Sequence, residues 1–180
     1  MNTTVTGIDC TKILFLDIET VPQYSSVLEL DDVERELWQK KSARLVEDGM
    51  SDEDLYKKAG IFAEFGKIIC ISAAFLRPKN GSYEMRVRSF YGDDEKEILN
   101  SFMAMVNKYF NTKKIFFCAH NGKEFDFPFI ARRALINGIQ IPLTLDSRGM
   151  KPWEIQHLDT LDLWRFGDYK NYTSLALLAH

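Results

Sequence analysis

The sequence predicts a single α/β domain built on a mixed sheet, and three observations lead to this prediction. Short apolar runs alternate with segments of helical spacing along most of the 180 residues. Apolar residues make up 46% and charged residues 27%, which is the balance of a folded domain. One tight turn signal joins two apolar runs, which should pair antiparallel, whereas helices separate the later runs, which should pair parallel. We therefore expect a five-stranded sheet, three antiparallel strands followed by two parallel ones, flanked by helices.

The chain begins with a predicted strand and a helical insert. Residues 12–19 (KILFLDIE) favour β structure and end in acids, which is typical of a strand that ends at a polar edge. Residues 29–65 have a helical composition and should form an insert in the domain. Within it we expect one helix in 31–48 and another over 52–65, the second capped by Ser51. The residues expected to anchor the first of these helices are Leu37, Trp38 and Leu45.

The next segments predict an antiparallel hairpin and a long helix. Residues 67–77 are almost continuously apolar, so we expect a central strand covered on both faces. The turn at 77–81 (RPKNG) leads into 83–91, whose alternation predicts a returning, half-exposed strand. The acids at 93–95 favour a helix start, because negative charge stabilises a helix N-terminus. The apolar residues at helical spacing that follow are Ile98, Leu99, Phe102, Met105, Val106, Tyr109 and Phe110.

The last third of the chain repeats the alternation of strand and helix. Residues 114–120 predict a short buried strand, and 126–137 predict a helix with Pro128 in its first turn. Residues 157–163 (HLDTLDL) are a candidate strand, and 173–180 begin another helix. No helix-stop signal follows that start, so we expect a C-terminally truncated domain that fills residues 1–180.

Charge and cysteine content narrow the functional classes. The net charge is −3, but residues 29–54 hold ten acids and four bases, which leaves 19 bases and 16 acids elsewhere. Nucleic acid therefore remains a possible partner. The three cysteines, Cys10, Cys70 and Cys118, lack metal-ligand spacing and indicate reduced thiols in a cytoplasmic protein. The longest apolar run, 68–76, is shorter than the roughly 20 residues that a membrane span needs.

A first pair of acids ends the opening strand. Side chains alternate along a strand, so Asp17 and Glu19 should share one face while Ile18 points into the core. Two carboxylates about 7 Å apart can share a divalent cation, which would offset their repulsion. The alternative is an acidic strand end that is simply solvated.

A second acidic segment follows the strand at 114–120. In Asn121-Gly122-Lys123-Glu124-Phe125-Asp126, Gly122 allows a tight turn and Asp126 lies at a helix N-terminus. The alternative here is that Asp126 serves only as an N-cap.

Taken together, these segments resemble the 3′–5′ exonucleases of the DEDD group, which have the ribonuclease H-like fold. The chain is most similar to the proofreading-exonuclease domain of family B DNA polymerases, in a stand-alone branch. The similarity covers about residues 12–180. The lines that carry it are ILFLDIETVP (13–22), KIICISAAF (67–75), FCAHNGKEFDFPFIARRALINGI (117–139) and HLDTLDLWRFG (157–167).

The resemblance implies a metal-dependent nuclease. Asp17 would bridge two divalent cations, Mg²⁺ or Mn²⁺, while Glu19 and Asp126 would complete parts of their ligand shells. Hydrolysis would release nucleoside 5′-monophosphates, and the resemblance favours the 3′ ends of single-stranded DNA as the substrate. The residues expected to contact the terminal nucleotide are Thr20, Val21, His120, Asn121 and Phe125.

The family's third motif, a Tyr or His shortly before a fourth acid, does not occur after the segment Ser174–Ala179, so we expect weak or no activity from this chain. His157 and Asp162 fit the spacing His-x-x-x-x-Asp formally, but they precede that segment. They are secondary candidates, as is Asp159 near the site.

Other interpretations remain open. The main alternative is a catalytically idle ribonuclease H-like module that binds nucleic acid or protein, and another is an endonuclease of the same fold. Phe125 could pack in the core instead of stacking on a base. Lys123, Arg132 and Arg133 could meet phosphates, although solvation on a helix face is the expected role of the arginines. No glycine-rich nucleotide loop occurs, and the three scattered histidines argue against zinc.

Overall fold

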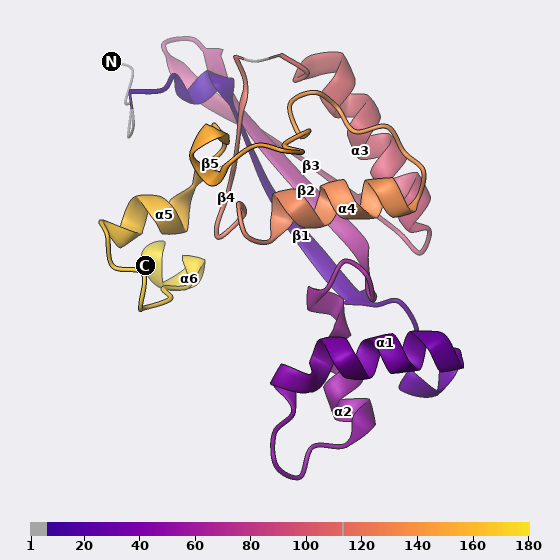
Figure 1. Cartoon of the computed structure of the whole chain (residues 1–180). Coiled ribbons are helices and arrows are strands. Elements are labelled where there is room, and N and C mark those ends of the chain that lie inside the picture. The colour runs from indigo at the N-terminus through magenta and orange to yellow at the C-terminus, as the bar shows by residue number, and fades with distance from the viewer. Residues whose placement is uncertain (1–6, 113) are drawn as a thin grey trace.

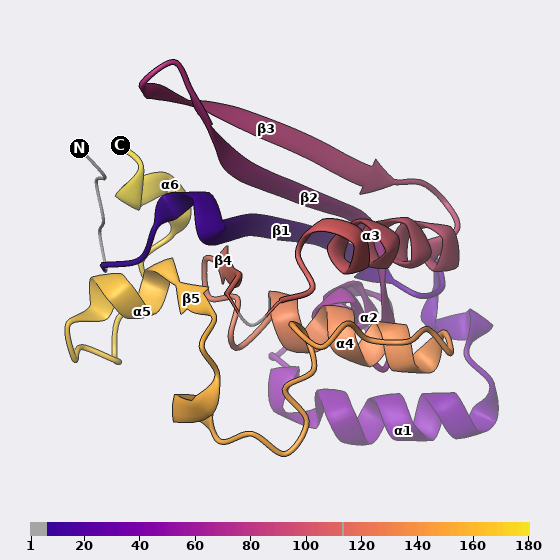
Figure 2. The ribbon, with the colours of Figure 1, turned by 90° about the horizontal axis from the view of Figure 1, so that it is seen from above.

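The computed structural model describes residues 7–112 and 114–180, which are arranged around one five-stranded sheet (Figures 1 and 2). The strand order is β3-β2-β1-β4-β5. Strands β1, β2 and β3 pair antiparallel, and β4 and β5 continue the sheet in parallel with β1. The predicted α/β fold with a mixed five-stranded sheet is therefore confirmed. The strands are β1 (Ile13–Pro22), β2 (Gly66–Lys79), β3 (Ser82–Tyr91), β4 (Phe116–Ala119) and β5 (Leu158–Asp159).

The β2–β3 hairpin matches the predicted strand pair. Its turn is centred on Asn80 and Gly81, whose φ angles of 49° and 79° are the left-handed values that this tight connection needs. The expectation that β2 is covered on both faces is wrong. Ile71 and Ala73 are buried, but the alternate residues Ser72 and Ala74 are only half-buried, because α3 and α4 both lie on the opposite face of the sheet (Figure 2).

Two helices cover the other face of the sheet and close the main core. Helices α3 (Glu95–Tyr109) and α4 (Asp126–Ile136) lie side by side there (Figure 2). Asp94 caps α3 by accepting hydrogen bonds from the backbone of Lys96 and Glu97. The inward residues of β1 and of the two helices share one hydrophobic cluster that includes Leu14, Leu16, Ile18, Leu99, Phe102, Phe127 and Ile130. Tyr109, expected among the apolar positions of α3, is instead exposed.

A buried ion pair joins these two helices. Arg133 of α4 is 4% exposed and donates to both carboxylate oxygens of Glu95, at 2.5 to 3.1 Å. Glu95 also accepts from the backbone N–H of Ile68, and Arg133 donates to the carbonyl of Ala63. The predicted solvation of Arg133 is therefore wrong: the position lies on the inner face of α4, where a buried carboxylate neutralises it.

The insert forms a small core of its own below the sheet in Figure 1. It contains α1 (Asp32–Ser42) and α2 (Asp52–Tyr56), each followed by a 3₁₀ helix, so both predicted helices end earlier than expected. Ser51 caps α2 as predicted. Trp38 is an anchor, with its ring 5.5 Å from that of Tyr56, but Leu37 is 52% exposed, so its predicted anchoring role is wrong.

The C-terminal segment departs most from the prediction. The expected strand over 157–163 is a two-residue strand, β5, followed directly by helix α5 (Thr160–Arg165). Asp159 causes the change, because its carboxylate accepts from the backbone N–H groups of Leu161 and Asp162 and caps the helix. Helix α6 (Leu175–Leu178) is capped by Ser174. Within 7–112 and 114–180, no helix combines the length and apolar character needed to cross a membrane.

Candidate active site

The candidate site lies where β1 passes the start of α4. Asp17 and Glu19 both occupy exposed positions of β1, whereas Ile18 between them is buried, so the predicted alternation is confirmed. Asp126 is the first residue of α4, and Phe125, not Asp126, occupies the cap position. The Asp126 side chain is buried, and its Oδ1 accepts a hydrogen bond of 3.2 Å from the backbone N–H of Ile18. This bond fixes Asp126 beside the strand segment that carries the two acids.

The ionised forms of Asp126 and Asp17 are both destabilised in this site. Burial, followed by repulsion from Asp17 and to a smaller degree Asp159, raises the pKa of Asp126 to about 7. Asp17 lies at an exposed position of β1, but partial desolvation of its carboxyl also raises its pKa. Within the described part of the chain, neither Asp17 nor Asp126 belongs to an ion pair. A cation bound here would therefore relieve a repulsion that the fold leaves in place.

The donor set suits a hard divalent cation, because all its ligands would be carboxylate oxygens. The charge pattern of Asp17 and Asp126 fits such an ion, and Glu19 is the next acid on the same face of β1. As the side chains stand, however, no three His, Cys, Asp or Glu residues of the described segments converge in a geometry that could hold a metal. Glu19 is thus not brought into one cluster with the other two acids.

Asp159 organises the loop that leads into α4. Its two carboxylate oxygens accept from the backbone N–H groups of Asn121, at 2.9 Å, and Lys123, at 3.1 Å. Asn121 has a φ of 59°, a left-handed conformation that asparagine tolerates. Gly122 is needed for space, since a Cβ there would lie 2.4 Å from the Cβ of Ala119. Asp159, expected near the site, therefore lies behind the loop and holds its backbone.

His120 is held at both ring nitrogens. Its Nδ1 is 2.9 Å from the hydroxyl of Thr160, and its Nε2 is 2.7 Å from the carbonyl oxygen of Thr173. The ring of Tyr172 meets it edge-on at 5.9 Å. Sequence reasoning missed these three partners, because they lie 40 to 53 residues further along the chain and belong to no motif.

A cavity of about 270 Å³ opens on the uncovered face of the sheet beside Asp17. Ser72, which pairs with Asp17 across β1 and β2, lines it together with His120 and Thr160. Leu175 of α6 closes one side. The structure thus brings Asp17 and His120 to one cavity, while Asp126 is hydrogen-bonded to Ile18, next to Asp17 in β1, and does not line the cavity.

The other predicted residues lie around this centre in different settings. Thr20 and Val21 follow a bulge in the β1–β2 pairing and are half-buried. Phe125 is also half-buried, with its ring 5.3 Å from that of Phe129, so it packs at the edge of the core.

The two secondary candidates are engaged elsewhere. The His157 ring stacks on Phe117 at 5.1 Å and contacts Phe127, and burial lowers its pKa to about 4. Asp162 forms ion pairs with Lys123, at 3.3 Å, and Arg165, at 3.1 Å. Packing and ion pairing thus account for both residues, and Lys123 faces a carboxylate.

One protein family matches most of the chain. Residues 61–177 match the model of a family described as a predicted 3′–5′ exonuclease related to the exonuclease domain of PolB. This range contains Asn121, Phe125 and Asp126 but not Asp17 or Glu19. No curated protein matches the sequence.

Solved structures with a similar arrangement include two larger nucleic-acid enzymes. E. coli exonuclease I in complex with a dT13 oligonucleotide is 14% identical, with a TM-score of 0.43 over 85% of this chain and 28% of that one. The family B DNA polymerase of the archaeon Pyrobaculum calidifontis is 16% identical, with a TM-score of 0.35 over 71% of this chain and 11% of that one. The chain thus corresponds to less than a third of either protein.

Proposed function

Because the chain belongs to the family of predicted 3′–5′ exonucleases related to the exonuclease domain of PolB, we propose that it hydrolyses phosphodiester bonds at the 3′ ends of nucleic acid. The proposed products are nucleoside 5′-monophosphates, and the proposed substrate is single-stranded DNA. The observation that carries this proposal is the unneutralised pair Asp17 and Asp126, whose charges repel each other where β1 passes the start of α4. A phosphodiester brings further negative charge, so the site needs cations to bind it.

Asp17, Glu19 and Asp126 are the proposed catalytic residues and metal ligands. Two Mg²⁺ or Mn²⁺ ions, when bound, would activate a water and stabilise the leaving 3′ oxygen. Asp126 would hold its ligand oxygen in place through the hydrogen bond from Ile18. Asp17 would present its carboxylate from β1 into the 270 Å³ cavity, where the terminal nucleotide would lie.

The residues around the cavity have proposed binding roles. Thr20, Val21 and Asn121 would contact the terminal nucleotide through the backbone segments that flank the acids. His120 is oriented by Thr160 and the carbonyl of Thr173, so its ring has a fixed position against the nucleotide. The half-buried ring of Phe125 would stack on a base. A cytoplasmic location, expected from the free thiols of the three cysteines, is part of the same proposal.

The test is cleavage of a 5′-labelled single-stranded oligonucleotide by an excess of protein, with Mg²⁺, Mn²⁺ or EDTA. We expect a ladder that shortens from the 3′ end, disappears in EDTA and falls by at least about 100-fold in Asp17→Asn and in Asp126→Asn. Asp146→Asn is the matched control, because Asp146 pairs with Arg148 away from β1 and should leave the ladder unchanged. Internal cuts without mononucleotide release would show an endonuclease and overturn the proposal.

A second candidate, an idle module that binds nucleic acid or protein, is favoured by one observation. No three possible metal ligands in the described residues converge as the side chains stand. A titration with Mn²⁺ followed by calorimetry separates the two functions. Saturable binding that Asp126→Asn abolishes supports the nuclease, whereas oligonucleotide binding that is insensitive to metal and to this substitution supports the idle module.

A further inference from the structure

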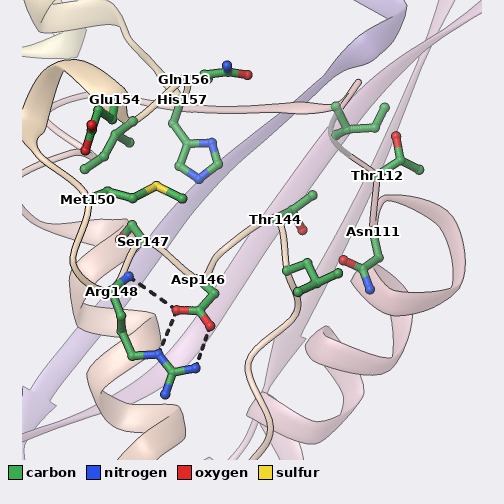
Figure 3. A pocket seen from close by; sticks show the side chains of 13 residues that line it. Asn111, Thr112, Thr144, Asp146, Ser147, Arg148, Met150, Glu154, Gln156 and His157 are labelled. Atoms are coloured by element: carbon green, nitrogen blue, oxygen red, sulfur yellow. Dashed lines mark hydrogen bonds and ion pairs between the residues drawn. The ribbon is translucent and has the colours of Figure 1, made fainter.

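A second, larger cavity lies at the opposite end of the parallel strands from the acids. Its volume is about 570 Å³, within the range of small-molecule sites. Its walls are Asn111, Thr112 and Ile115, which follow α3, and residues of the loop from Leu143 to His157 (Figure 3). Both segments adjoin the starts of β4 and β5, whereas Asp126 follows the end of β4. The exonuclease proposal uses none of these residues.

Two polar atoms in the wall of this cavity are buried and lack a partner. The side-chain oxygens Oδ1 of Asn111 and Oγ1 of Thr144 form no hydrogen bond among the described residues. Asn111 already donates its amide N–H to Asn107, which leaves its oxygen as the unsatisfied acceptor. Asn111 and Thr144 line the same cavity, and Figure 3 labels both of them with His157. Buried acceptors without donors are unfavourable, and a ligand that carries N–H groups would satisfy them.

The charged groups of the wall argue against an anionic ligand. Arg148 is engaged by Asp146 through two hydrogen bonds of 2.7 and 2.5 Å, drawn as dashed lines in Figure 3. Glu154 adds a carboxylate that accepts only from the backbone N–H of Lys151. The half-buried ring of His157 stacks on Phe117, and its pKa, lowered to about 4, leaves it neutral at pH 7. Among the described residues of the wall, a phosphate or carboxylate would therefore meet the Glu154 carboxylate and a guanidinium that Asp146 already engages.

The remaining wall is apolar and partly uncovered. Leu143 and Met150 line the cavity although they are 79% and 50% exposed, and Ile115 and Ile155 lie beside them. Such side chains would gain burial if a flat apolar surface covered them. The described wall of the cavity thus combines apolar contact surface with hydrogen-bond acceptors, and its one cationic side chain, Arg148, is paired with Asp146.

We propose that this cavity binds a neutral nitrogen heterocycle with an exocyclic amino group, which is the chemistry of an amino-bearing nucleobase in a nucleoside without phosphate. The amino group donates to the oxygens of Asn111 and Thr144, and the ring lies against Leu143 and Met150. The site is separate from the acids of β1 and does not depend on the proposed nuclease activity.

The experiment is isothermal titration of the whole chain with adenosine, with purine riboside, which lacks the amino group, and with adenosine 5′-monophosphate. Adenosine should bind, purine riboside should bind roughly tenfold more weakly, and the monophosphate should bind more weakly than adenosine. Thr144→Val removes the hydroxyl at nearly constant volume and should weaken adenosine binding by a similar factor. Leu143→Trp, at an exposed position that tolerates size, should block it.

Two controls keep the proposal falsifiable. Thermal unfolding of each variant verifies that it folds, and Asp17→Asn should leave adenosine binding unchanged because Asp17 lies outside this cavity. Absence of adenosine binding at millimolar concentration would overturn the proposal. Binding that survives Thr144→Val and Leu143→Trp but is lost in Asp17→Asn would also overturn it, since the nucleoside would then occupy the nuclease site.

Discussion

Glu95 and Asp126 are two buried acids of the same domain with opposite charge environments. Glu95 is 8% exposed, and its carboxylate receives hydrogen bonds from Arg133 and from the amide of Asn137. Asp126 is 3% exposed, but Asp17 repels its charge and no basic group faces it in the described residues. The protein neutralises the first carboxylate internally, whereas the second requires something from outside. The difference separates an acid that maintains the fold from an acid that marks a binding site.

The largest expected effect comes from removing the cation that pairs with Glu95. Arg133→Met leaves Glu95 buried without its cation, which should lower the free energy of unfolding by about 3–5 kcal/mol. Urea denaturation at pH 7 measures this change. Arg132→Met is the matched control at an exposed position, where the change should stay within about 0.5 kcal/mol.

A double variant tests whether the cause is the unpaired charge. Glu95→Gln combined with Arg133→Met removes both charges and should recover part of the lost stability. If Arg133→Met loses less than about 1 kcal/mol, the pair does not hold α3 and α4 together and the contrast with Asp126 disappears.

At Asp126 we expect the substitution to raise the free energy of unfolding instead of lowering it. Its pKa rises from 3.8 in the unfolded chain to about 7 in the fold, so the folded state binds the proton more tightly. Stability contributed by this group is therefore present below pH 3.8 and is lost as the pH rises through 7. Asp126→Asn, measured without divalent cations at pH 8, should be more stable than the natural chain by up to about 4 kcal/mol.

Added cations should reverse this advantage. Mn²⁺ should raise the melting temperature of the natural chain at pH 8 and leave that of Asp126→Asn unchanged, because only the natural carboxylate gains from the ion. The advantage of the variant should also vanish near pH 4. A variant that is less stable than the natural chain at pH 8 would show that the hydrogen bond from Ile18 outweighs the repulsion.

The sequence predicts the position of Asp126 but not the ion pair of Glu95. The alternation around Asp17 and the position of Asp126 at a helix start follow from local spacing, so both could be predicted. The role of Arg133 could not, because its partners Glu95 and Ala63 lie 38 and 70 residues away and only the packed helices bring them together.

The same limit applies to the C-terminal segment. Turn chemistry and helix spacing predicted the mixed sheet and its first four strands at close to their observed lengths, since these are properties of short windows. The strand expected over 157–163 failed because Asp159 caps a helix there, a competition that apolar spacing does not reveal. The partners of His120 could not be predicted either, because they are distant in the sequence, like those of Arg133.

The half-buried His157 extends the comparison, because its stability should change with pH in the direction opposite to that of Asp126. Burial lowers the pKa of His157 from 6.5 to about 4, so the unfolded state binds the proton more tightly. The associated stability is present above pH 6.5 and is lost as the pH falls towards 4, by up to about 3 kcal/mol. His157→Gln should flatten acid unfolding between these values, as followed by circular dichroism. His180→Gln, at an exposed histidine, should leave the slope unchanged.

The smallest effect comes from an acid next to Glu95 in the sequence. Asp94 is exposed and caps α3 by accepting from the backbone of Lys96, at 2.8 Å, and Glu97, at 3.2 Å. Asp94→Ala should cost about 1 kcal/mol of unfolding free energy, and Asp94→Asn, which keeps the acceptor, should cost less. Urea denaturation that gave Asp94→Ala a loss as large as that of Arg133→Met would contradict the distinction. Asp94 and Glu95 would then contribute equally to the free energy of unfolding. Burial next to a paired cation would not explain why one carboxylate maintains the fold and the other only caps a helix.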